Sequence, residues 1–437
     1  MADKVIVTNL SALRTKYGSG LTRIRAAIRR LVAADRKRGL RTRLVALDSK
    51  TAMKKLGAPA VSDAADFEQN KRAIDAIYRK LLPDYIMILG AIDIVPHQNL
   101  KNPVFDGDDD PDVYAYSDLP YACEAPYSQK PEDFVAGTWR ARDDRAYLPY
   151  LGFSAQIWEG STRRSLRKAF GSADDLRLSP PKGPRWPAAQ LQRRAQFINC
   201  QGAQADFHFY GEQKRTGAQP VSHTTPWIDG KIAEGTVVAA ECCYGSELYD
   251  PSLAGQQAGI CSTYLAGGAY AVVGATTIAY GEANRDTDAD LMCQYFFRHV
   301  LSGSSLGRAF LEARQDFAQS APELDPTSVK TLAQFTLLGD PSIHPVNIPA
   351  VPTPQGMRRR KGARAADAAR VERHARRQQL MIKGLTIGRT QPTAVRTRPL
   401  PGLQEAGRGV WTQRLRQRHG GREHDENTEQ ARPGQAL

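Results

Sequence analysis

The chain has 437 residues, which is enough for two or three domains of about 100–200 residues each. Its hydrophobic fraction of 41 % and charged fraction of 24 % are ordinary for a globular protein. The net charge of +14 is uneven, because residues 356–437 hold 19 Lys/Arg and 7 Asp/Glu, whereas residues 1–355 hold 41 and 39. The basic character therefore belongs to the C-terminal segment, and the main body is close to neutral.

Several classes of protein are excluded by the composition. No run approaches the roughly 18 apolar residues that a membrane span requires, and the N-terminal "MADKVIVTNL" lacks the apolar region of a signal peptide. The six cysteines have irregular spacings and form no CxxC pairs, so neither a disulfide framework nor a zinc site is indicated. We therefore expect a cytoplasmic protein with free thiols and no contact with a membrane.

The first half of the chain alternates between two kinds of segment. Short apolar runs predict strands, and runs with apolar residues at helical spacing predict helices. The predicted strands are 4–9, 42–48 and 133–139, residues 83–96 are predicted to be a buried strand followed by a loop, and the predicted helices are 21–39 and 66–82. This alternation indicates a mainly parallel sheet covered by helices on both faces.

The alternation restarts after about residue 152. Strands are predicted at 153–158, 195–200, 236–243 and 270–277, and helices at 161–171, 256–269, 287–301, 304–318 and 326–337. We therefore predict two adjacent α/β units, residues 1–152 and 153–348. Residues 349–437 are rich in Pro, Gly, Arg and Gln and poor in large apolar residues, which predicts a disordered basic tail.

An acidic stretch, "FDGDDDPDVYAYSDLPY", interrupts the first unit. The alternating Asp106, Asp108 and Asp110 are a candidate Ca²⁺ site, because Ca²⁺ binds several oxygen ligands. The closing Gly and Glu of a calcium loop are missing, which favours a solvated acidic loop. No other cofactor is indicated.

Reactive residue types follow two strands of the second unit. "QFINCQGA" ends at Gln201 and Gly202, and "VVAAECCYGS" ends at Cys242 and Cys243. His208 lies between them in the sequence. A thiol, an imidazole and a glycine that lets a carbonyl approach the backbone are the groups a cysteine peptidase needs at the edge of an open sheet. The alternative is structural, because cysteine is among the most buried residues.

The motifs resemble those of a known family. "AECCYG" resembles the Ala-x-Cys-x-x-Gly nucleophile strand of caspase-like cysteine peptidases, especially the gingipain family. "LLGDPSIHP" (337–345) and "PDYIMILGAIDIVP" (83–96) are similar to two further segments of that family, and the resemblance spans roughly residues 80–346. It implies two caspase-like units, the first non-catalytic and the second catalytic. It also implies a cysteine endopeptidase that acts on polypeptides.

The resemblance also implies roles for individual residues. It makes Cys242, three residues before Gly245, the nucleophile, and it makes the N–H groups of Cys242 and Gly202 the oxyanion hole. Cys243 is then expected to turn the other way, because side chains alternate along a strand. The nearby pocket residues are Glu241, Cys243 and Gly245.

One departure from the family concerns the catalytic base. Gln201 stands where the catalytic His is expected, and an amide cannot transfer a proton near neutral pH. Two hypotheses follow. Either His208 supplies the imidazole, or the protein is a pseudoenzyme that binds a peptide or a partner without cutting it.

The basic tail suggests a further partner. Its cationic side chains could bind nucleic acid nonspecifically through the phosphate backbone. A solvated linker or interaction tail is the alternative. The oligomeric state is not indicated by the sequence.

Overall fold

A computed structural model describes residues 2–118, 122–124, 146–320 and 324–346. The strand predicted at 133–139 lies outside the described residues. So does the whole of the predicted disordered tail at 349–437, with its predicted binding of nucleic acid. Among the described residues, every helix is too short or too polar to cross a membrane. The cytoplasmic location stays a prediction.

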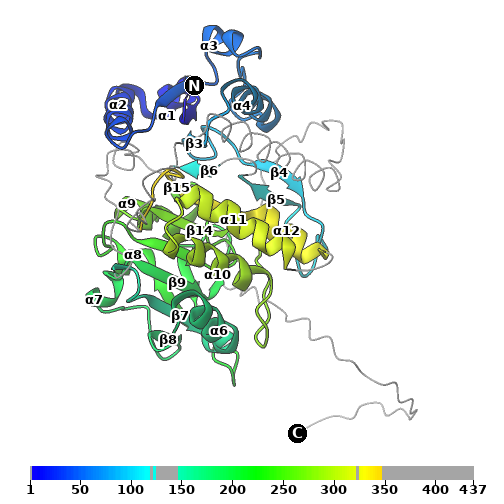
Figure 1. Cartoon of the computed structure of the whole chain (residues 1–437). Coiled ribbons are helices and arrows are strands. Elements are labelled where there is room, and N and C mark those ends of the chain that lie inside the picture. Colours follow the sequence, from blue (N-terminus) through cyan, green and yellow to red (C-terminus); the bar gives the residue numbers. More distant parts are fainter. Residues whose placement is uncertain (1, 119–121, 125–145, 321–323, 347–437) are drawn as a thin grey trace, which may run out of the picture.

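Ten strands of the described residues form one sheet in the order β2-β1-β3-β6-β15-β14-β13-β9-β7-β8 (Figure 1). Neighbours are parallel except β14 and β15, which are antiparallel. The sheet therefore consists of two parallel blocks that run in opposite directions and meet at β14 and β15. The strands are β1 (Lys4–Thr8), β2 (Thr42–Ala46), β3 (Tyr85–Leu89), β6 (Ala122–Glu124), β7 (Leu151–Ala155), β8 (Leu176–Ser179), β9 (Ala195–Asn199), β13 (Val237–Ala240), β14 (Ala271–Ala275) and β15 (Phe335–Gly339).

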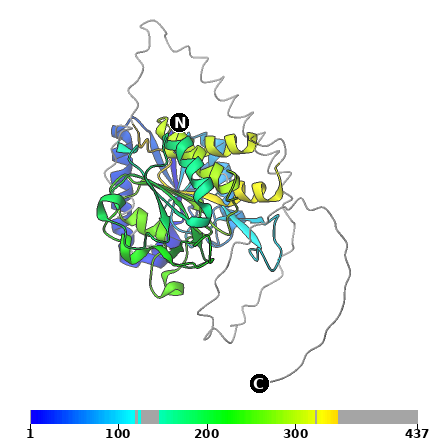
Figure 2. The same cartoon turned by 90° about the horizontal axis from the view of Figure 1, so that it is seen from below.

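Helices cover the sheet, as the alternation predicted. Two buried clusters receive alternate residues of β13: Val238 and Ala240 join one, and Val237 and Ala239 join the other, so the clusters lie on opposite faces. The helices are α1 (Leu10–Tyr17), α2 (Leu21–Lys37), α3 (Lys50–Lys55), α4 (Phe67–Leu81), α6 (Glu159–Phe170), α7 (Ala188–Leu191), α8 (Thr225–Ile228), α9 (Ile260–Ala266), α10 (Asp288–Leu301), α11 (Leu306–Gln319) and α12 (Pro326–Gln334). Figure 2 shows the strands between helices when the molecule is seen from below.

Helix α4 illustrates how local sequence defines these elements. Its N-cap Asp66 accepts a hydrogen bond from the N–H of Gln69 at 2.9 Å, which satisfies one of the free donors of the first turn. Ala73, Ile74 and Ile77 recur at helical spacing and are buried against the sheet. The amphipathic helix predicted at 66–82 is therefore confirmed.

The end of the helix predicted at 326–337 is wrong. Helix α12 ends at Gln334, and Phe335–Gly339 form β15, the strand at which the two blocks meet. The residues of β15 are buried on both sides, so its apolar run carries no alternation that would distinguish it from a buried helix.

Two smaller sheets complete the described fold. The hairpin of β4 (Gln98–Lys101) and β5 (Tyr114–Ser117) contains the acidic stretch in its loop. The second sheet has the order β10 (Gln201–Gly202), β11 (His208–Tyr210) and β12 (Val221–Thr224), and it directly follows β9. The fold is α/β with a mainly parallel central sheet, as predicted. The boundary predicted between residues 152 and 153 falls inside β7, and the division into units stays a prediction.

Candidate active site

The two strand ends singled out from the sequence are neighbours. β9 and β13 pair in parallel with Ile198 opposite Ala240, so the residues that follow them leave the sheet at the same edge. The backbones then touch: a Cβ at Gly202 would lie 2.0 Å from the carbonyl oxygen of Cys243. Only glycine permits this approach. The structure therefore brings Gln201 and Gly202 together with the cysteine pair.

The thiol of Cys242 is buried in the apolar core. The residue is 0 % exposed and packs in the cluster that contains Cys200 and Tyr264. Its Sγ lies 4.0 Å from the carbonyl oxygen of Ile198. Burial, together with the neighbouring Cys200, raises the pKa of the Cys242 thiol well above its ordinary value. These surroundings favour the neutral thiol, which is the weaker nucleophile.

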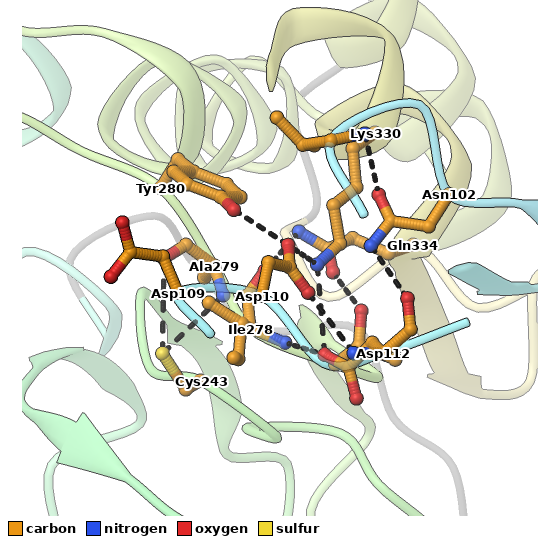
Figure 3. A network of polar contacts seen from close by, with 12 residues as sticks. Asn102, Asp109, Asp110, Asp112, Cys243, Ile278, Ala279, Tyr280, Lys330 and Gln334 are labelled. Carbon is orange, nitrogen blue, oxygen red and sulfur yellow. Dashed lines mark hydrogen bonds and ion pairs between the residues drawn. The ribbon is translucent and has the colours of Figure 1, made fainter. Parts of the chain in front are cut away.

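Cys243 belongs to the opposite face, as the alternation of strand residues predicted. The N–H of Ala279 donates to its Sγ at 3.4 Å (Figure 3). The next residue, Tyr244, has a φ of +56°, a left-handed conformation that is uncommon for a bulky side chain and turns the chain sharply after Cys243. Such backbone strain gathers at functional sites.

Gln201 occupies the position where the resemblance predicts a histidine. It is nearly buried, and its Nε2 donates to Glu212 at 2.7 Å. Gln219 donates to the same Glu212 oxygen at 3.2 Å. The amide of Gln201 is therefore held in a fixed hydrogen bond and supplies no titratable group.

His208 lies on the strand next to Gln201 and Gly202. In the antiparallel pair of β10 and β11, Gln201 is opposite Tyr210, so these two side chains share a face. His208, two residues before Tyr210, is on that same face. The imidazole predicted as the alternative base is therefore placed on the side of the sheet where residue 201 points.

Asp206 orients this imidazole and was missed by the sequence reasoning. The Nδ1 of His208 donates to Asp206 at 2.7 Å, and the hydroxyl of Tyr210 donates to the other carboxylate oxygen at 2.7 Å. Burial alone would raise the pKa of Asp206, but the bonds from His208 and Tyr210 outweigh it and lower that pKa. The Asp-x-His spacing was the available signal, because residues two apart on a strand share a face.

Glu247 is a second residue that the sequence reasoning did not assign. Its carboxylate accepts the N–H of Ala205 at 2.7 Å, so it anchors the turn that follows Gly202. Burial raises the pKa of Glu247 to about 7, against a lowering effect of this hydrogen bond. Ala205 has a φ of +49°, so the turn that Glu247 holds is also strained.

The acidic stretch forms ion pairs and hydrogen bonds with residues 278–280 and with α12 (Figure 3). Lys330 and the Tyr280 hydroxyl both contact Asp110, and the N–H of Ile278 donates to Asp112 at 2.9 Å. Asp106 accepts N–H groups of its own loop, including that of Asp108 at 3.0 Å. Asp110 therefore faces Lys330 and not a shared Ca²⁺ site, and no group of three potential metal ligands occurs among the residues that the structure describes.

The predicted pocket residues Glu241 and Gly245 lie around the same strand end. Glu241 lines a small cavity with Trp158, Asn199 and Asp290. Burial and the nearby Asp290 raise the pKa of Glu241. At Gly245, a Cβ would lie 3.0 Å from the carbonyl oxygen of Cys242, so this glycine allows the tight turn.

Comparisons with known proteins concern the family and the fold of this chain. Residues 214–346 match the family model of peptidase family C25, a range that includes the cysteine pair but not Gln201 or His208. The crystal structure of the Arg-specific cysteine proteinase gingipain R (RGPB) has 11 % sequence identity and a TM-score of 0.50, with 78 % of each chain covered. The predicted resemblance to the gingipain-type cysteine peptidases, with their caspase-like fold, is therefore confirmed.

Two further solved structures are similar to the chain. The complex of Porphyromonas gingivalis RgpB pro- and mature domains has 10 % identity, a TM-score of 0.47 and coverage of 78 % of this chain and 79 % of that one. A structure described only as a protease has 13 % identity, a TM-score of 0.47 and coverage of 81 % and 82 %. Curated protein sequences give no match.

Proposed function

We propose that this chain is a cysteine endopeptidase that acts on polypeptides, with a thiol of the Cys242–Cys243 pair as nucleophile and His208 as proton carrier. The match to peptidase family C25 covers the cysteine pair and supports the nucleophile. The contact between Gly202 and Cys243 supports the main-chain N–H of Gly202 as an oxyanion donor.

The observation that carries the proposal is the Asp206–His208 pair beside Gly202. A carboxylate on Nδ1 fixes the tautomer of an imidazole and leaves its Nε2 to exchange a proton, which is the arrangement of a general base. His208 faces the side where residue 201 points. In this proposal the adjacent strand supplies the imidazole that the family pattern has at residue 201 and that this chain lacks.

The reaction follows the general course of thiol peptidases. The thiol proton passes to His208, the sulfur bonds to the carbonyl carbon of the scissile peptide, and N–H donors hold the oxyanion. The C–N bond breaks as His208 returns the proton to the leaving amine. Water then hydrolyses the thioester, which releases the new carboxyl terminus and restores the thiol.

The test compares alanine substitutions of His208 and His299, two histidines whose ring nitrogens each bond a carboxylate. His208→Ala is expected to lower the rate of hydrolysis of an unfolded polypeptide by about 10²–10⁴-fold, the usual contribution of a general base. His299→Ala is the matched control, since His299 also bonds a carboxylate, at 2.8 Å to Asp316, but lies on α10. Equal activity of both variants and the native chain would contradict the proposal.

A second candidate function is the binding of a peptide or partner without hydrolysis. Two observations favour it: Gln201 is held by Glu212, and the Cys242 thiol is closed in the core. This pseudoenzyme hypothesis predicts that a peptidyl acyloxymethyl ketone labels Gln201→His protein but not the native chain. Selective labelling of the native chain would eliminate it.

A further inference from the structure

The two adjacent cysteines lie in clusters on opposite faces of the sheet, and this difference distinguishes them as candidate nucleophiles. Cys242 shares a buried cluster with Cys200, the residue before Gln201. Cys243 follows Cys242 by one residue, as Gln201 follows Cys200. Cys243 packs in the cluster on the other face. Continued beyond its last printed pair, Ala240 with Ile198, the parallel register would bring residue 243 beside residue 201.

Main-chain contacts give the same assignment. A Cβ built on Gly202 would lie 2.0 Å from the carbonyl oxygen and 3.6 Å from the amide nitrogen of Cys243. No atom of Cys242 is among its three nearest neighbours. Gly202 therefore lies against the main chain of Cys243.

The two sulfur atoms also have different polar partners. The Cys243 sulfur accepts the N–H of Ala279 at 3.4 Å, and a donor of this kind stabilises a thiolate. The segment that carries this donor is fixed on both sides by the acidic stretch, through Ile278 to Asp112 and Tyr280 to Asp110 (Figure 3). Each sulfur also has a carbonyl oxygen nearby, that of Ile198 at 4.0 Å for Cys242 and that of Ala279 at 3.7 Å for Cys243. Burial keeps the pKa of the Cys242 thiol well above the ordinary value, because it outweighs a main-chain hydrogen bond from Cys200 that lowers this pKa.

We propose that Cys243, and not Cys242, is the nucleophile of this chain. This inference rests on the proposed peptidase function and corrects the residue that the resemblance indicated. The Cys243 sulfur forms the bond to the substrate carbonyl carbon, and its proton passes to His208. Cys242 is a structural residue of the apolar core, although it stands three residues before Gly245.

The experiment is covalent labelling with a peptidyl acyloxymethyl ketone, in which the thiolate displaces the carboxylate leaving group and forms a thioether. Native chain and the Gln201→His variant are labelled briefly, and fragment ions between residues 242 and 243 locate the adduct. We expect the adduct on Cys243 in both proteins. This localisation requires no substitution at either cysteine, so it does not depend on whether such a variant folds.

Substitutions provide an independent readout. Cys243→Ala is expected to abolish both labelling and hydrolysis, whereas Cys242→Ala retains the adduct on Cys243. Cys293→Ala is the matched control, because Cys293 is a buried thiol of α10. Brief alkylation of the native chain with iodoacetamide is expected to modify Cys243 faster than Cys242.

The outcomes separate this inference from the function on which it rests. An adduct on Cys242 would overturn the assignment of Cys243 while leaving a cysteine peptidase. Absence of an adduct on both cysteines, in folded native and Gln201→His protein, would overturn the peptidase function and the nucleophile together. An adduct on Cys243 in Gln201→His protein alone would support the assignment and show that the native chain is a pseudoenzyme.

Discussion

The ammonium group of Lys330 forms a fully buried ion pair with the carboxylate of Asp110, although the two residues are 220 positions apart. Lys330 lies on α12, and Asp110 lies in the loop between β4 and β5. The Tyr280 hydroxyl donates to the same carboxylate at 2.5 Å. Because Tyr280 follows Ala279, this ion pair holds the segment that contacts Cys243.

Removal of Lys330 is predicted to destabilise the fold. Lys330→Met leaves the Asp110 charge buried without its cation, which costs about 3–5 kcal/mol in the free energy of unfolding. Urea denaturation of native and variant chains measures the difference. Arg72→Met is the control, because the pair of Arg72 with Glu68 is exposed and contributes little. If Lys330→Met lowers the free energy of unfolding no more than Arg72→Met does, the Lys330–Asp110 ion pair does not stabilise the fold.

A methyl group at residue 202 is predicted to damage the site. Gly202→Ala places a Cβ 2.0 Å from the Cys243 carbonyl oxygen, so one of the two backbones must move. We expect reduced stability and loss of labelling by the acyloxymethyl ketone. Gly107→Ala is the matched control, since its Cβ meets nothing within 4 Å. Full labelling of folded Gly202→Ala protein would mean that this contact does not define the site.

Asp206 is predicted to act through His208. Asp206→Asn removes the carboxylate that orients the imidazole, so kcat is expected to fall roughly tenfold or more while KM changes little. Tyr210→Phe removes the second bond to Asp206 and leaves the carboxylate on His208, so its kcat should fall less. Steady-state kinetics on one peptide substrate measure both. A change in KM with an unchanged kcat would indicate that Asp206 contacts substrate and does not orient His208.

Glu247 is predicted to make stability depend on pH. Its folded pKa of about 7 exceeds the ordinary value of 4.5, so the folded state binds the proton more tightly. The resulting stabilisation, about 3 kcal/mol, is fully present below pH 4.5 and is lost as the pH rises to 7. The unfolding free energy of the native chain minus that of Glu247→Gln, measured from pH 5 to 8, should therefore fall as the pH rises, because the variant lacks the titrating carboxyl. A constant difference would show that Glu247 does not titrate in this range.

Much of the fold could be predicted because local patterns report burial. Apolar runs predicted β1, β3 and β13, and helical spacing predicted α2, α4 and α10, since each pattern arises within one segment. The error at Phe335–Gly339 has the same origin, because a strand buried on both faces has no alternation to identify it.

The sequence by itself determined the chemistry that is available. It placed Gln201, Gly202 and two cysteines at the ends of two strands, and strand ends of a parallel block must meet at one edge. Only the tertiary structure decided that Gly202 lies against the main chain of Cys243, that Asp206 bonds His208, and that Lys330 pairs with Asp110. Lys330 and Asp110 are distant in the sequence. Which residues of two strands lie side by side depends on the register between the strands. Neither relationship is encoded in any single segment, so the sequence supplied the residues and tertiary packing selected their partners.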